Sequence, residues 1–109
     1  MKPLAAEVLY NGKVAGVLRR SANQFSFRYS PDYLASDLPA ISLTLPKQEG
    51  VFVSPVLFSF FSGLLAEGVA KQIQCRELGI DEEDEMLRLL KTAHSETIGA
   101  VTVREIPAL

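Results

Sequence analysis

The sequence predicts an α+β domain: a small antiparallel or mixed β-sheet, about three helices in the second half, and a strand at the C-terminal end. Three observations predict it. Apolar and polar residues alternate as in strands through the N-terminal half, apolar residues follow helical spacing over residues 54–93, and alternation returns at residues 98–106. Strands followed by helices indicate helices packed on one side of the sheet. At 109 residues with 48% hydrophobic side chains, residues 1–109 are expected to form one domain.

An N-terminal hairpin is the clearest element of this sheet. Residues 7–10 and 13–18 flank Asn11-Gly12, a dipeptide that tolerates the positive φ angles of a type I′ turn. Apolar and polar side chains then alternate over residues 25–29 and again over residues 41–45. This two-residue period predicts two more strands, each with one buried face.

Two Ser-Pro pairs predict helix starts, because serine caps a helix and proline fits its first position. Ser30-Pro31 predicts a short helical turn, and Ser54-Pro55 predicts a helix that reaches about residue 64. Most apolar residues of this second helix share one face, whereas Phe58 and Leu65 fall outside it. The segment is therefore apolar over more of its circumference than a single core contact requires.

Two further helices are predicted in the second half. Residues 67–78 form one, which ends at Gly79, a residue that accepts positive φ. Asp81 is expected to cap the next, whose apolar residues between positions 86 and 93 lie on one side. The acidic run at 82–85 matches the positive end of a helix dipole, so we interpret it as a solvated face rather than a metal site.

Composition and motifs favour a binding protein over an enzyme. The net charge of −2 argues against direct nucleic-acid binding, and we interpret the single basic doublet, Arg19-Arg20, as a solvated strand end. No phosphate-binding loop, nucleophile elbow or kinase base motif occurs. One cysteine, Cys75, and one histidine, His94, make neither a zinc site nor an evident catalytic pair, and Cys75 is expected to be buried. We therefore expect no catalytic residue, no metal and no cofactor.

The N-terminus and the longest apolar run bear on location. Residues 1–4 lack the apolar core of a signal peptide, and the run from Val51 to Val69 is interrupted by serine, proline, glycine and glutamate. Neither a membrane span nor an internal disulfide framework is predicted, and the expected location is the cytoplasm.

Several sequence landmarks occur together in the order and spacing of a known family. They are Val8 to Gly12 with Gly16 to Leu18, Phe25 to Tyr29, Pro39 to Pro46, Phe60 to Gly68 (FFSGLLAEG), Leu78 to Ile80 and Ile98 to Val101. Together they resemble the N-terminal subdomain of HipA-type Ser/Thr kinase toxins over nearly the whole chain. One departure is Ala66, where the family commonly has proline after the Leu-Leu pair.

The resemblance implies a partner-binding function. A HipA toxin would continue beyond the position of Leu109 into an ATP-binding kinase core, so the chain resembles HipS, the free-standing small subunit of tripartite HipBST toxin–antitoxin systems. That resemblance implies an antitoxin that binds and neutralises a separately encoded HipT-like Ser/Thr kinase. A HipB-like helix-turn-helix protein would supply DNA binding in a ternary complex.

Two alternatives remain open. One is a non-inhibitory structural subunit that completes the kinase or bridges it to the HipB-like protein. The other is a small enzyme whose site is assembled with a partner; it has the least support, because no acid–base pair, nucleophile or metal cluster is located in the sequence.

The apolar excess after Phe58 marks the candidate docking surface, because exposed apolar patches often bind proteins. The expected partner-binding residues are Phe58, Phe61, Gly63, Leu64, Leu65, Ala66, Glu67 and Gly68. The alternative is that the two leucines complete the core, which applies more to Leu64 than to Leu65. Since the chain has no tryptophan, an inserted anchor would be aliphatic or phenylalanine.

Overall fold

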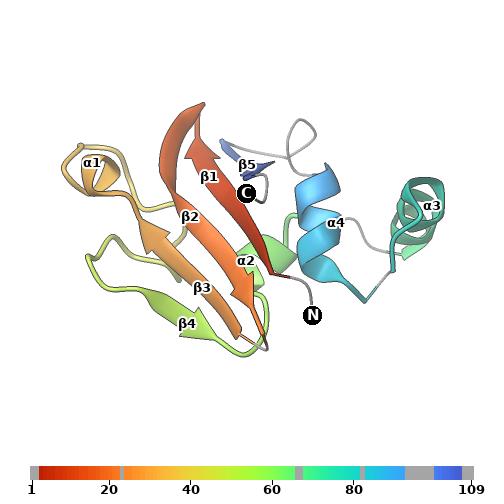
Figure 1. Ribbon diagram of the computed structural model, residues 1–109. Coiled ribbons are helices and arrows are strands. Elements are labelled where there is room, and N and C mark those ends of the chain that lie inside the picture. The colour runs from red at the N-terminus through yellow and green to blue at the C-terminus, as the bar shows by residue number, and fades with distance from the viewer. Residues whose placement is uncertain (1–2, 23, 66–67, 82, 93–99, 107–109) are drawn as a thin grey trace.

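The computed structural model describes residues 3–22, 24–65, 68–81, 83–92 and 100–106, and it has the predicted α+β architecture (Figure 1). Five strands form one sheet in the order β4-β3-β2-β1-β5, and every pairing is antiparallel. The strands are β1 (Leu4–Tyr10), β2 (Lys13–Ser21), β3 (Gln24–Tyr29), β4 (Phe52–Ser54) and β5 (Val101–Glu105). The helices in the described part of the chain are α1 (Pro31–Leu34), α2 (Ser59–Ser62), α3 (Gly68–Leu78) and α4 (Glu85–Thr92).

The β1–β2 hairpin confirms the prediction from Asn11-Gly12. Asn11 has φ 49° and Gly12 has φ 82°, the two positive values that a type I′ turn requires. Further along β2, a side chain at Gly16 would place its Cβ 2.3 Å from the carbonyl oxygen of Arg28. Glycine at this position therefore lets β2 and β3 approach each other closely.

One face of the sheet, called here the inner face, carries the hydrophobic core. Its buried strand residues include Val8, Leu18 and Phe27, which neighbour one another through the strand registers. Phe61 of α2 and Leu89 of α4 belong to the same buried cluster. In Figure 1, α2 lies behind β1 and β2, so the opposite, outer face is turned towards the viewer.

The strand predicted over residues 41–45 is wrong: this segment is a turn. The Leu45 N–H donates to the Ser42 carbonyl at 3.1 Å, and these two residues form only an isolated bridge. The reason is the buried phenol of Tyr29, which donates to the Leu45 carbonyl and accepts from the Ile41 N–H at 3.1 Å. A side chain thus satisfies the backbone groups that a neighbouring strand would otherwise pair. Leu43, at the tip of the turn, is fully exposed.

The helix predicted to begin at Ser54-Pro55 is also wrong in its start. Ser54 ends the short strand β4, which pairs with β3, and its hydroxyl accepts from the Val56 N–H at 3.2 Å. The helix α2 begins only at Ser59 and lasts four residues. The chain forms strand β4 rather than the start of a helix because Phe52, paired with Phe27 in register, places its ring against the core.

The helix ends are set largely by local chemistry. Gly79 follows α3 with φ 68°, and the Ile80 N–H donates to the Cys75 carbonyl at 3.0 Å, as in a Schellman motif. At the start of α4 the cap is Asp84, whose carboxylate accepts from the Leu87 N–H at 3.1 Å. The expected cap, Asp81, instead accepts from the Glu83 N–H in the preceding turn. The N-cap of the Ser30-Pro31 turn and the strand pattern of β5 are as predicted.

Candidate partner-binding surface

Two residues of the segment expected to bind a partner, Phe61 and Leu65, lie in the core. Phe61 is fully buried, with its ring 5.9 Å from that of Phe27. Leu65 is 7% exposed and belongs to the core cluster, which agrees with the alternative that it completes the core. Phe61 lies in the short helix α2, and Leu65 follows three residues after that helix ends.

Other members of the segment do reach the surface. Phe58 and Leu64 are half-buried and pack against the rim of the core. Gly63 ends α2 and Gly68 begins α3 with φ 62°, and both are exposed. Ala66 and Glu67 lie outside the described residues.

Exposed apolar side chains gather instead around the edge strand β4. Val51, Val53 and Val56 are 52%, 53% and 65% exposed. The sequence contained one signal for a strand here that the prediction overlooked: Val51, Phe52 and Val53 are β-branched or aromatic residues, which favour strands. The exposed valines therefore mark a surface that sequence reasoning missed.

The basic doublet is divided between the two faces of the sheet. Arg20 is only 4% exposed, and its Nη1 lies 2.7 Å from Oδ1 of Asp84, so its interpretation as a solvated residue is wrong. Arg19, its neighbour, is exposed on the outer face, as predicted. The Asp84 member of the acidic run is therefore an ion-pair partner, which joins β2 to the start of α4.

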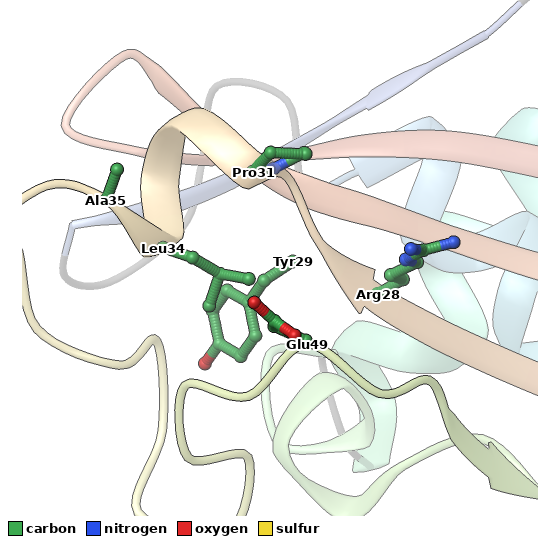
Figure 2. Close-up of a pocket in the computed structure, with 6 residues that line it drawn as sticks. All are labelled: Arg28, Tyr29, Pro31, Leu34, Ala35 and Glu49. Carbon is green, nitrogen blue, oxygen red and sulfur yellow. The ribbon is translucent and has the colours of Figure 1, made fainter.

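A shallow pocket of about 370 Å³ lies where β3 runs into α1 (Figure 2). Its lining residues are Arg28, Tyr29, Pro31, Leu34, Ala35 and Glu49. Figure 2 shows the Arg28 guanidinium directed away from the other five side chains. The pocket brings together no nucleophile with a base, so it fits a binding surface better than a catalytic site.

The two tyrosines near this pocket are structural. Burial raises the pKa of Tyr29, an effect that the hydrogen bond from the Ile41 N–H partly opposes. Burial likewise raises the pKa of Tyr33, whose hydroxyl donates to the Pro39 carbonyl at 2.6 Å. The two rings stack at 5.8 Å with an angle of 11° between their planes. Both phenols are thus engaged in hydrogen bonds with backbone groups.

Other candidate chemistry has no support in the described part of the chain. Cys75 is buried, as predicted, and His94, its only conceivable histidine partner, lies outside the described residues. Among residues 3–22, 24–65, 68–81, 83–92 and 100–106, no three His, Cys, Asp or Glu side chains are arranged to hold a metal ion. Within the same ranges, no helix has both the length and the apolar character needed to cross a membrane.

Comparison with known proteins identifies the fold. A protein of Haemophilus influenzae, described as uncharacterized, is 35% identical over 101 residues, which make up 93% of this chain and 92% of that protein. A solved structure of the N-terminal domain of HipA toxin matches with a TM-score of 0.74 at 29% identity, covering 97% of this chain and 95% of that one. The family model described as HipA N-terminal domain matches residues 6–104, a range that contains β2 to β4, all four described helices and nearly all of β1 and β5. The chain therefore belongs to the HipA N-terminal domain family.

Proposed function

We propose that this chain is the non-kinase component of a HipA-related toxin–antitoxin system, and that it binds and neutralises a separately encoded HipT-like Ser/Thr kinase. The observation that carries the proposal is the family match over residues 6–104. The described fold is thus accounted for by a domain that is not the kinase domain. The Haemophilus influenzae relative is similar to this chain over nearly its whole length.

The chemistry of the described residues supports inhibition by binding rather than by catalysis. Both tyrosines with raised pKa values are used in backbone hydrogen bonds, and the lone thiol of Cys75 is buried. A stoichiometric inhibitor needs only a complementary surface, and a preorganised one binds with less loss of entropy. The proposal includes a cytoplasmic location, where a free thiol stays reduced.

Part of the proposed kinase interface is the surface rim of the segment after β4. Phe58 and Leu64 supply half-buried apolar area there, with exposed Gly63 and Gly68 beside them. Phe61 and Leu65 would act indirectly, by fixing this rim against the core. Ala66 and Glu67 belong to the proposed interface by their place in the sequence.

The test is titration of the kinase. A HipT-like Ser/Thr kinase is purified, and its phosphorylation of a protein substrate is measured with zero to two equivalents of this chain. We expect a stable complex and loss of activity near one equivalent. A complex with unchanged activity would show a structural subunit, and a third, DNA-binding protein in that complex would show a bridging role. If no complex forms, the proposed function is wrong.

A paired substitution tests the proposed rim. Leu64→Ala removes half-buried apolar area from the rim, whereas Ile73→Ala removes a similar side chain, 49% exposed, from α3. We expect at least tenfold weaker kinase binding for the first and little change for the second. Circular dichroism of both variants checks that the fold is retained, and equal affinities would exclude Leu64 from the interface.

A further inference from the structure

The outer face of the sheet is turned towards the viewer in Figure 1, where none of the described helices lies in front of it. The strand registers define which residues point outward together. Arg28 of β3 lies opposite Val17 of β2, Arg19 of β2 lies opposite Ser26 of β3, and Ser26 in turn lies opposite Val53 of β4. Two arginines and an edge valine thus share one corner of this face.

Positive charge is concentrated at this corner, although the chain as a whole carries a net charge of −2. Arg19 and Arg28 are exposed and, among the described residues, have no ion-pair partner. Arg104 on the same face differs, because its Nε donates to Glu7 at 3.1 Å. From the register, Arg19 and Arg28 are diagonal neighbours, a relation that puts two residues roughly 7–8 Å apart. Two like charges at that spacing repel each other weakly and leave room for a carboxylate between them.

Apolar surface adjoins these charges. Val53 is 53% exposed beside Ser26, and Val51 and Val56 extend the exposed apolar area along and beyond β4. Arginine next to buried apolar side chains is typical of the energetically important centre of protein interfaces. Val56 also lies two residues before Phe58, so this corner is continuous along the chain with the rim proposed above for kinase binding.

We infer that Arg19, Arg28 and Val53 form a docking surface, the Arg19–Arg28–Val53 surface, for an acidic surface of the kinase subunit. Carboxylates of the kinase would pair with the two guanidinium groups, and an apolar side chain would cover Val53. Arginine is suited to this role because its planar group binds a carboxylate through two parallel hydrogen bonds. The inference rests on the proposed function, since the kinase is the partner, and it adds an electrostatic contact that the sequence did not predict.

The experiment measures affinity for the intact kinase with charge-reversed variants of this chain. Arg19→Glu, Arg28→Glu and the double variant are compared with Arg76→Glu, which makes the same charge change at an exposed position on α3. We expect about tenfold weaker binding for each single variant, more for the double variant, and little change for the control. The affinity of the unaltered chain should fall as NaCl is raised, whereas that of the double variant, whose glutamates repel the acidic surface, should rise.

The stability and the binding of these variants together test the docking surface. Because neither arginine takes part in a described ion pair, the variants should keep their melting temperatures within about 2 °C, and a larger fall would assign these arginines to the fold instead. If the unaltered chain binds the kinase and the double variant binds equally well, the docking surface is wrong while the proposed function stands. If the chain binds no kinase, both are wrong. If the double variant binds a 30-base-pair DNA duplex more weakly than the unaltered chain does, but binds the kinase equally well, the surface binds nucleic acid and the inference is overturned.

Discussion

Asp84 offers the sharpest test of how the helices are joined to the sheet. Its Oδ1 receives a hydrogen bond from Arg20 at 2.7 Å and another from the backbone of Leu87 at 3.1 Å. Replacement by alanine removes an N-cap, which costs about 1 kcal/mol. It also removes the carboxylate that pairs with the Arg20 guanidinium, which is only 4% exposed. We expect this loss to cost about 2 kcal/mol more, because Arg20 keeps other contacts. For a domain of this size, the resulting ~3 kcal/mol corresponds to a fall in melting temperature of about 12 °C.

Urea denaturation followed by circular dichroism measures this effect. Asp84→Asn should lie between the unaltered chain and Asp84→Ala, because the amide oxygen still caps the helix while the charge is lost. Asp81→Ala is the matched control: its carboxylate caps only an exposed turn and should contribute no more than about 0.5 kcal/mol. If Asp84→Ala is no more destabilising than this control, the buried ion pair stabilises nothing, and Arg20 is held in place by its remaining contacts.

Two further predictions concern the sheet and the turn packed against it. Gly16→Ala should destabilise the fold by more than about 2 kcal/mol in urea denaturation, because its Cβ would clash with a backbone carbonyl that cannot rotate away. Gly50→Ala, where the added atom meets only a flexible side chain at 3.5 Å, should change stability little, and equal effects would contradict the close-approach argument. Tyr29→Phe should cost about 1–3 kcal/mol, because it leaves two buried backbone groups of the turn without a partner. The raised pKa of Tyr29 also predicts alkaline instability. The contribution of Tyr29 to the free energy of unfolding is full below its unfolded pKa of about 10 and is lost as pH rises through the folded pKa. Tyr29→Phe should therefore flatten the decline of stability at high pH, and an unaltered pH profile would refute the reasoning.

The parts of the fold that could be predicted from sequence are those with local causes. The turn at Asn11-Gly12, the serine cap of α1 and the glycine that ends α3 each depend on a few adjacent residues. The period of apolar residues likewise identified β3 and β5, because one face of each is buried. Local chemistry was therefore enough wherever the backbone partner was close in sequence.

The errors arose where a distant residue decided the structure. Residues 41–45 alternate like a strand, yet the phenol of Tyr29, twelve or more residues away, takes up their backbone groups. Ser54-Pro55 resembles a helix start, yet pairing of Phe52 with Phe27 draws the chain into the sheet. Leu65 fell outside the apolar face of the predicted helix, yet it lies in the core three residues after α2 ends. No spacing rule within the segment contains that information.

Arg19 and Arg20 show how one sequence feature can serve two functions. Successive side chains in a strand point to opposite faces, so a doublet on β2 must place one guanidinium on each side of the sheet. The inner one is buried and requires a carboxylate, which Asp84 supplies from the start of α4. The outer one has no such partner among the described residues and lies diagonally from Arg28. Placing Arg20 on the outer face and Arg19 on the inner face would require a one-residue shift of β2, which would also turn Leu18 outward. Burial of Leu18 in the core therefore fixes which arginine is available for docking.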